Sequence, residues 1–359
     1  MAADPATEVK KPARLPSQTH HVIVKLETIH VALPDVDMGS MTHETIGYEY
    51  TRPSEAGVVA ARAWPASVLV TTTVPINKDT LGEAPYLKCV ITETTGTDHI
   101  DLEECRRRGI TVMYAPHATV EAVSEHALGL YFSARRRLVT LHNTMMDHDG
   151  ARTNPWRAKG SMSSLLFDAE GRPPHTCGNE VAGVIGYGPI GQRLAKLCGA
   201  LGMEVLVAAR KDATAAAAAA PRVPFDEVLR RATVLFLVVP LTPDTRDLIS
   251  ERELALMRPD AVVVNVGRGG TVNEAALLAA LRAGGIAGAA TDVFEVEPAG
   301  SGRDSVLLGE GARGVNLTLT PHLAWCADQT RMNIRRVVGE NIALFVSGEK
   351  GTNVVLDMR

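Results

Sequence analysis

Short apolar runs alternate with segments of helical periodicity along most of the chain. In the first part, strands are expected at residues 22–26, 68–70, 87–91 and 111–114, and helices at 55–63 and 102–108. The pattern restarts after residue 180, with strands at 181–185, 205–208, 234–239, 261–266, 288–293 and 317–320 and helices at 192–201, 225–232, 250–257 and 273–283. Strands that alternate with helices build parallel sheets from βαβ units. The pattern therefore predicts an α/β fold, with a six-stranded doubly wound sheet of the Rossmann type in the second part.

Three further stretches depart from this alternation. A long amphipathic helix is expected at 120–137, and its apolar centre suits either the core or contact with a second subunit. Residues 147–178 are rich in Gly, Ser, Pro and Asp and predict a long loop, while the alanine run at 215–220 predicts a surface connection or the start of a helix. A last helix is expected at 328–347, before the apolar residues 354–356.

The composition excludes several classes of protein. A chain of 359 residues is too long for one small core and predicts two domains. A net charge of −4, with 22% charged and 45% apolar residues, gives no electrostatic basis for binding nucleic acid or an anionic membrane. No apolar run reaches the roughly 18 residues of a membrane span. The first 20 residues lack the apolar core of a signal peptide and are expected to form a frayed leader.

Cysteine usage bears on the compartment and on metal binding. The cysteines are odd in number and show no metal-type spacing, so we expect a reducing compartment, a cytoplasmic location and no metal site. Each is expected to be a small buried apolar side chain. They are Cys89, Cys105, Cys177, Cys198 and Cys326.

The segment 181–191 contains an apolar strand that leads into Gly-x-Gly-x-x-Gly ahead of a helix, which is the arrangement of the dinucleotide fingerprint. Gly186 would form the tight turn, and Gly188 would let a pyrophosphate approach the backbone. Gly191 would let the helix pack closely on the strand. The helix start at Pro189 and Ile190 would face the phosphates. We therefore expect a dinucleotide site, with an ordinary strand-to-helix turn as the alternative.

The end of the next strand indicates which dinucleotide is bound. NAD-binding units place an acid there to hold the ribose 2′-hydroxyl, but this strand ends on Ala209 and two cations follow. Arg210 would pair with a 2′-phosphate in a bidentate fork, and Lys211 would add a point charge. This favours NADP(H) over NAD(H). In the alternative, both cations are solvated and Asp212 takes the place of the missing acid.

Three segments beyond the glycine loop carry chemistry-bearing residues at the ends of predicted strands. They contain Arg268, Glu297 and His322, which would converge because ligands bind at the carboxyl ends of the strands in an open α/β sheet. Reduction of a ketone by hydride needs a proton for the developing alkoxide, and a histidine is suited to supply it. A carboxylate would orient the imidazole and favour its protonated form, and a guanidinium would polarise the carbonyl and hold a substrate carboxylate.

These residues resemble the D-isomer-specific 2-hydroxyacid dehydrogenase family. The resemblance extends from about residue 68 to the C-terminus, and earlier residues match only in outline. The motifs that carry it lie at residues 95–101, 186–191, 265–270, 292–298 and 321–325.

The resemblance implies roles for particular residues. It makes Arg268, Glu297 and His322 the catalytic set. Backbone amides at Thr94, Thr95 and Gly96 form the nest for the substrate carboxylate, which agrees with the way that bare N–H groups bind anions. Asp292 contacts the nicotinamide carboxamide. The remaining expected cofactor contacts are Val239, Pro240, Val266, Gly267 and Ala324.

The resemblance also implies a split architecture. A dinucleotide-binding Rossmann domain, residues 116–324, would be inserted into a discontinuous Rossmann-like or flavodoxin-like substrate domain made of residues 1–115 and 325–359. The crevice between them would close on the substrate and exclude water. The helix 120–137 corresponds to the family's dimerisation arm, which favours a homodimer. This chain departs from the family pattern at Ala209 and in the length of the 147–178 loop.

Within the family, the motifs most resemble glycerate dehydrogenases, the hydroxypyruvate and glyoxylate reductases. Trp325 would wall a pocket for a small side chain, or else simply pack between the domains. Formate dehydrogenases carry Gln where Glu297 stands, and phosphoglycerate dehydrogenases add a regulatory domain. We therefore expect NAD(P)H-dependent reduction of a small 2-keto acid. A dinucleotide-sensing corepressor on the same fold is the alternative, and a structural dimer module without cofactor is a third.

Overall fold

The computed structural model describes residues 7–146, 154–211, 222–349 and 351–358. The chain forms two compact units, one made of Met1–Thr119 with Cys326–Arg359 and one of Val120–Trp325. The second unit is therefore inserted into the first. Each unit contains one predominantly parallel sheet with helices, so the predicted two-domain α/β fold is confirmed.

The sheet of the first unit has six strands in the described residues, in the order β13-β5-β4-β3-β1-β2. All neighbours pair in parallel except β13, which is antiparallel to β5. The strands are β1 (His20–Lys25), β2 (Thr42–Gly47), β3 (Val68–Thr71), β4 (Cys89–Thr92), β5 (Thr111–Met113) and β13 (Val354–Leu356). The edge strand β2 was not predicted, because its sequence Thr-His-Glu-Thr-Ile-Gly is largely polar and mostly solvent-exposed.

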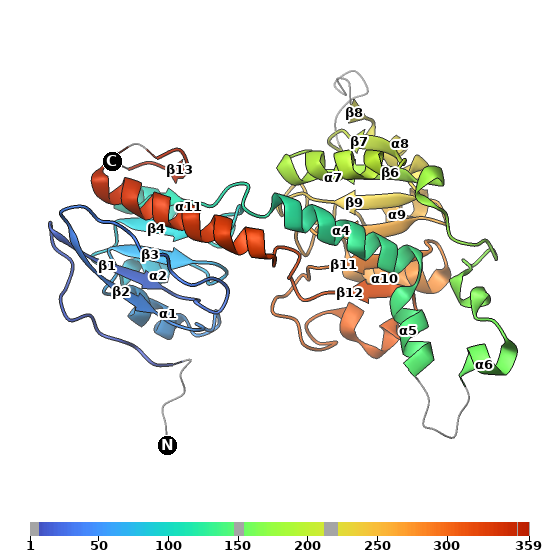
Figure 1. Ribbon diagram of the computed structural model, residues 1–359, viewed down its shortest axis with the longest axis horizontal. Helices are drawn as coiled ribbons and strands as arrows, with labels where there is room; N and C mark the ends of the chain where they lie inside the picture. Colours follow the sequence, from blue (N-terminus) through green and yellow to red (C-terminus); the bar gives the residue numbers. More distant parts are fainter. Residues whose placement is uncertain (1–6, 147–153, 212–221, 350, 359) are drawn as a thin grey trace. The chain divides into compact units, whose positions relative to one another are not determined.

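Helices supply the rest of the first core. Strand residues such as Val22, Val24 and Val90 pack with Val59, Leu81 and Cys105 from three helices. These are α1 (Ala56–Ala63), α2 (Lys78–Gly82) and α3 (Leu102–Arg108). The long helix α11 (Asp328–Ser347) packs against β4 and buries Ile334, Val338 and Ile342 (Figure 1).

The expectation of a frayed leader is wrong for the described residues from Thr7 onward. The main-chain N–H of Lys10 donates to the Tyr48 hydroxyl at 2.9 Å, and its Nζ donates to the Gly47 carbonyl at 2.9 Å. Arg62 is fully buried and donates through Nε to the Glu8 carbonyl at 3.0 Å. A buried guanidinium needs acceptors for its five N–H groups, and this segment supplies one of them.

The sheet of the second unit has seven parallel strands in the described residues, in the order β12-β11-β10-β9-β6-β7-β8. The strands are β6 (Val181–Ile185), β7 (Glu204–Ala208), β8 (Arg222–Val223), β9 (Val234–Leu237), β10 (Val262–Asn265), β11 (Gly288–Thr291) and β12 (Leu317–Leu319). The short β8 raises the number above the six predicted. Apolar side chains cover both faces of the sheet, as parallel sheets require.

The two faces of this sheet carry different helices. One core joins the sheet to α4 (Val120–Arg135) and α7 (Pro189–Ala200), and the other joins it to α8 (Phe225–Arg231), α9 (Glu251–Leu256) and α10 (Glu274–Ala283) (Figure 1). Helix α7 begins at Pro189 and not at residue 192 as predicted. Gly188 is its N-cap, and Pro189 suits the first helical position because it has no N–H to leave unpaired.

The helix expected at 120–137 is interrupted. α4 ends at Arg135, Arg137 has a φ of 46°, and α5 (Leu138–Met146) follows. Part of the expected long loop at 147–178 is ordered into α6 (Pro155–Lys159) and two 3₁₀ turns, Ser163–Leu166 and Cys177–Asn179. The alanine run at 215–220 and Asp212 lie outside the described residues.

The cysteines and the longer helices complete the description of the fold. Cys89, Cys105 and Cys198 are buried and Cys177 is partly so, but Cys326 is exposed, which contradicts the expectation for that residue. It lies in the segment between β12 and α11. Among the residues described, no helix has both the length and the apolar composition to cross a lipid bilayer.

Candidate active site

The carboxyl edge of the seven-stranded sheet collects the predicted residues of the second unit. Gly186 follows β6, Val239 and Pro240 follow β9, Arg268 follows β10 and His322 follows β12. Because parallel strands all end at the same edge, residues far apart in the sequence meet there.

The glycine loop has the geometry that the fingerprint predicts. Gly186 has a φ of +97°, which a residue with a side chain rarely adopts. A Cβ on Gly191 would lie 2.0 Å from the Gly186 carbonyl oxygen, so only glycine fits there. In contrast, a Cβ on Gly188 would meet nothing within 4 Å. Gly188 is the N-cap of α7, and no side chain caps this helix start, so the space beside Gly188 is free for a phosphate at the helix N-terminus.

A second glycine supports the neighbouring strand end. A Cβ on Gly267 would lie 2.7 Å from the Val239 carbonyl oxygen, so the segments after β9 and β10 pack backbone to backbone. Val266 is buried at this contact, Val239 is half-buried and Pro240 is exposed. The two segments that contain the predicted cofactor contacts, residues 239–240 and 266–267, therefore lie side by side.

The two cations after β7 have different surroundings. Lys211 Nζ lies 3.1 Å from the carboxylate of the buried Glu253 and donates to the Leu248 carbonyl at 3.2 Å. Arg210 is exposed, and no hydrogen bond or ion pair joins it to another residue in the described parts of the chain. Lys211 is therefore committed to a partner within the protein, whereas the guanidinium of Arg210 faces solvent.

Glu297 and His322 form the expected pair. His322 Nδ1 lies 2.5 Å from Glu297 Oε2, and Glu297 Oε1 accepts the main-chain N–H of Phe294 at 2.8 Å. Because a carboxylate only accepts, His322 carries a proton on Nδ1 and its Nε2 points away from the pair. The side chains are 38% and 32% exposed, so the imidazole is accessible.

The backbone of His322 is strained and firmly held. Its φ of 55° lies in the left-handed region, which is unfavourable for a residue with a Cβ. Its N–H donates to the Asp292 carbonyl at 2.7 Å, and its own carbonyl accepts the indole N–H of Trp325 at 3.0 Å. The Trp325 side chain, predicted to wall the substrate pocket, thus contacts the histidine through its polar group.

Asp292 anchors the segment that carries the histidine. Its side chain is 1% exposed and accepts hydrogen bonds from Leu323 N at 2.9 Å, Ala324 N at 2.8 Å and Thr320 Oγ1 at 2.6 Å. The carboxylate needs these donors because burial removes its hydration. Thr320 was not among the predicted site residues, since a threonine before Pro carries no distinctive sequence signal.

Arg268 lies on a loop whose backbone is held by hydrogen bonds from the Asn265 side chain. The Asn265 side chain accepts from Gly267 N at 3.1 Å and donates to the Arg268 carbonyl at 3.1 Å, and Thr271 Oγ1 donates to the same carbonyl at 2.7 Å. A Cβ on Gly269 would lie 1.7 Å from the Phe294 carbonyl oxygen. The Arg268 loop therefore packs directly on the backbone that leads to Glu297.

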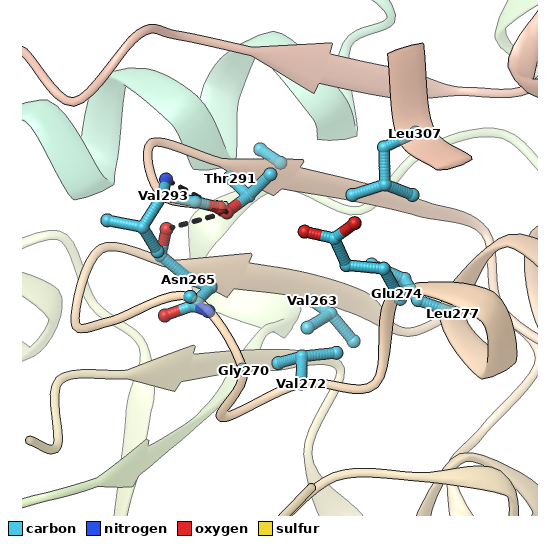
Figure 2. A pocket seen from close by; sticks show the side chains of 11 residues that line it. Val263, Asn265, Gly270, Val272, Glu274, Leu277, Thr291, Val293 and Leu307 are labelled. Carbon is cyan, nitrogen blue, oxygen red and sulfur yellow. Dashed lines mark hydrogen bonds between the residues drawn. The ribbon is translucent and has the colours of Figure 1, made fainter. Parts of the chain in front are cut away.

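A small pocket lies beneath this loop. Figure 2 shows Asn265 and Thr291 on one side of it and Glu274 on the other. The Glu274 carboxylate accepts from Glu295 N at 2.9 Å and from Ser305 Oγ at 2.5 Å, so it supports the segment before Glu297. The rest of the lining is largely apolar, which makes the pocket part of the support and not a ligand site.

The predicted substrate nest lies in the first unit, after β4. The Thr94 N–H donates to Thr92 Oγ1 at 3.2 Å, and Thr94 Oγ1 donates to the Gly96 carbonyl at 2.5 Å. Within the described residues, the N–H groups of Thr95 and Gly96 donate to no protein acceptor. Two of the three predicted donors are thus available to a ligand, and the third shapes the turn.

Next to this turn lies a buried cluster that the sequence did not indicate. Lys25 and Glu93 form an ion pair with both side chains 0% exposed, and burial lowers the pKa of Lys25 and raises that of Glu93. Glu27 is also fully buried and accepts the N–H groups of Thr72 at 2.8 Å, Thr73 at 2.8 Å and Val74 at 3.1 Å.

Comparison with known proteins gives the family. Residues 128–324 match the model of the D-isomer specific 2-hydroxyacid dehydrogenase NAD-binding domain. The chain is 35% identical to the glycerate dehydrogenase of Methylorubrum extorquens over 87% of its own length and 92% of the relative's. It is 32% identical to the glyoxylate reductase of Thermococcus litoralis over 83% and 86% of the two chains.

Solved structures agree with this result. A Thermus thermophilus protein superposes with a TM-score of 0.74 at 27% identity, covering 93% of this chain and 100% of the other. An NADPH-dependent glyoxylate/hydroxypyruvate reductase from Sinorhizobium meliloti, 24% identical, shares the fold with a TM-score of 0.73 over 94% and 97% of the two chains. The chain belongs to the D-isomer-specific 2-hydroxyacid dehydrogenase family.

Proposed function

We propose that this protein reduces a small 2-keto acid of the glyoxylate or hydroxypyruvate type to a D-2-hydroxy acid. A nicotinamide dinucleotide cofactor, which the family assignment supports, supplies the hydride when bound. The observation that carries the proposal is the Glu297–His322 pair at the sheet edge that also bears the Gly186–Gly191 loop. The relatives named glycerate dehydrogenase and glyoxylate reductase support the substrate class.

In this proposal His322 is the general acid in the reduction and the general base in the reverse reaction. Its Nδ1 is bound to Glu297, which leaves Nε2 to give a proton to the alkoxide that develops when the carbonyl accepts hydride. Glu297 stabilises the charged imidazole and fixes its orientation. Arg268 binds the substrate and polarises its carbonyl, and its loop is held in place by Asn265.

The bare N–H groups of Thr95 and Gly96 are proposed to bind the substrate carboxylate, with the Thr94 side chain shaping their turn. We retain Trp325 as a residue that favours a small substrate. Its hydrogen bond to the His322 carbonyl fixes the indole next to the catalytic histidine. Enlarging the room at this position with Trp325→Ala should raise kcat/KM for bulkier 2-keto acids relative to glyoxylate.

The residues of the second unit fit a dinucleotide. The pyrophosphate would lie over Gly188, where an added Cβ would meet nothing within 4 Å, and over the start of α7 at Pro189 and Ile190. Asp292 and Ala324 would meet the nicotinamide end, and residues 239–240 and 266–267 would line the path between. We propose NADP(H) as the preferred cofactor, with NAD(H) as a possible second, because the exposed Arg210 follows Ala209 where an acid would repel a 2′-phosphate.

We further propose a homodimer formed through residues 120–137 and the adjoining α5. Exposed apolar side chains follow one another along this stretch, among them Phe132 at 37%, Leu138 at 50%, Val139 at 42% and Met146 at 63% exposure. Such a patch on a globular protein commonly marks an association surface. Light scattering of the wild type and of Leu138→Glu tests the assembly. The absence of disulfides among the five cysteines is in keeping with a cytoplasmic location, which fractionation of the native cells would test.

A panel of 2-keto acids, assayed with NADH and with NADPH, tests the proposal. Glyoxylate and hydroxypyruvate should give the highest kcat/KM, and NADPH should exceed NADH. Activity confined to branched or aromatic 2-keto acids would reject the substrate class. The dinucleotide-sensing corepressor is not favoured, because the relatives named above are enzymes.

A further inference from the structure

A chain of hydrogen bonds leads from the middle of α4 to the segment that carries His322. His126 Nε2 lies 3.0 Å from Thr320 Oγ1, and Thr320 Oγ1 donates to Asp292 Oδ1 at 2.6 Å. The helix runs beside β11 and β12, and Asp292 and Thr320 directly follow these two strands (Figure 1). All three side chains belong to the second unit.

The chemistry of the three groups fixes the direction of this chain. The Asp292 carboxylate only accepts, so the single proton of the Thr320 hydroxyl points to it. The hydroxyl oxygen must then accept from His126, which therefore carries its proton on Nε2. His126 Nε2 is also 3.6 Å from Asp292 Oδ1, which adds electrostatic attraction whenever the imidazole is charged.

Asp292 in turn holds the backbone of His322 and of the two residues that follow it. Its carbonyl accepts the N–H of His322, and its carboxylate accepts those of Leu323 and Ala324. His322 itself has a φ of 55°, a strained conformation that persists only where neighbours enforce it. The position of the imidazole thus depends on how firmly Asp292 is held.

We propose that His126 and Thr320 are positioning residues for the reaction, acting through Asp292 on the placement of His322. The inference rests on the proposed function and deepens it. Neither residue needs to touch the substrate. Their effect is on the geometry of proton transfer, which is sensitive because a displacement of about 1 Å can reduce the rate by about 100-fold.

Variants at Thr320 test the hydroxyl. Thr320→Val removes the hydroxyl at nearly constant volume and should lower kcat for glyoxylate with NADPH about tenfold, with the KM for glyoxylate within threefold of wild type. Thr320→Ser retains the hydroxyl and should restore kcat to within threefold. The matched control is Thr318→Val, since Thr318 Oγ1 pairs with Ser133 of α4 at 3.0 Å and, within the described residues, forms no hydrogen bond with Asp292. It should leave kcat unchanged.

Variants at His126 test the other end of the chain. His126→Leu should lower kcat about fivefold, whereas His126→Gln, whose amide can donate at the same place, should recover most of it. In a double-mutant cycle, Thr320→Val and His126→Leu should be far from additive, because both break the same chain. Equal losses in Thr320→Val and Thr320→Ser, or full activity in Thr320→Val, would overturn the proposal.

A spectroscopic measurement separates this inference from the proposed function. In protein labelled with ¹⁵N-histidine, His126 should show the Nε2–H tautomer in the wild type and in Thr320→Ser, and lose that signature in Thr320→Val. The His322 signals should change in Thr320→Val but not in Thr318→Val. A wild type without activity on any 2-keto acid rejects the proposed function, while these spectra still decide whether the chain exists. An Nδ1–H tautomer at His126 in the wild type would reject it.

Discussion

The carboxyl edges of the two sheets hold ionisable pairs in opposite environments. In the first unit, Lys25 and Glu93 are 0% exposed, and Glu27 beside them receives main-chain N–H groups. In the second unit, Glu297 and His322 are about one-third exposed. Lys25 ends β1, Glu93 follows β4, and Glu297 and His322 follow β11 and β12, so the place of a residue at a strand end does not distinguish the two pairs.

The difference separates charge used for architecture from charge used for chemistry. Burial of an ion pair is costly, and the first pair is tolerated because each carboxylate oxygen there finds donors within the protein. The second pair uses one side of the imidazole and leaves the other accessible to solvent. A proton-transfer group must exchange protons with a ligand, so the exposed pair is the one suited to catalysis.

Among substitutions in the two ionisable pairs, we expect the largest effect from a change at His322. His322→Gln should reduce kcat by about 10²–10⁴-fold, because the proton donor is lost. Thermal unfolding should change little, since the ring is partly exposed and its main-chain bonds remain. Steady-state kinetics and calorimetry measure the two quantities. A loss of stability without loss of kcat would place this pair in the same class as Lys25–Glu93.

A substitution at Lys25 is expected to lower stability, in contrast to the change at His322, which lowers kcat. Lys25→Met leaves the buried Glu93 without its counter-ion and should lower the free energy of unfolding by about 3–5 kcal/mol. The double variant Lys25→Met with Glu93→Leu removes both charges and should recover most of this loss. Chemical denaturation of the three proteins provides the measurement. A double variant no more stable than the single one would show that the pair is net stabilising.

The glycine loop offers a comparison within a single turn. Gly191→Ala forces a Cβ against the Gly186 carbonyl and should lower stability by about 1–3 kcal/mol. Gly188→Ala enters open space, so unfolding should be unchanged while the Kd for NADPH rises roughly tenfold, about 1.4 kcal/mol. Binding titration and denaturation of both variants distinguish packing from ligand approach. An unchanged Kd for NADPH in Gly188→Ala would show that the pyrophosphate does not bind next to Gly188.

The smallest effect concerns cofactor choice. Arg210→Ser should lower kcat/KM with NADPH by about threefold to tenfold and leave the NADH value nearly unchanged, because a single exposed guanidinium is lost. Lys211→Ser serves as the matched comparison, since its ammonium is already paired with Glu253. Equal losses of kcat/KM with NADPH and with NADH in Arg210→Ser would show that Arg210 does not bind the 2′-phosphate.

Several elements of this fold could be predicted because the local pattern of residues determines them. The apolar run 181–185 is strand β6, and the run predicted at 234–239 contains strand β9 over Val234–Leu237, because parallel sheets bury both faces. The Gly186 loop is recognisable because Gly186 and Gly191 each meet a local steric demand. The pairing of Glu297 with His322 could be anticipated from their common sheet edge. Family membership was correctly inferred from the same motifs.

Features that depend on tertiary partners were not predictable in this way. Lys25 and Glu93 are 68 residues apart, and nothing in either segment marks a buried charge. The polar strand β2 is fixed by its parallel partner β1 and not by its own periodicity. The interruption of the helix at Arg137 and the pairing of Lys211 with Glu253 likewise depend on contacts that the local sequence does not encode.

The insertion of one unit into the other has a consequence for biosynthesis. The ribosome completes Val120–Trp325 as one continuous stretch, so this unit can fold as soon as it emerges. The sheet of the first unit lacks β13, and its face lacks α11, until the last residues are made. At about 5–20 residues per second, its nascent strands wait on the order of tens of seconds for these elements. During that interval the edge of β5 that later pairs with β13 is open, and an unpaired strand edge can pair with another chain.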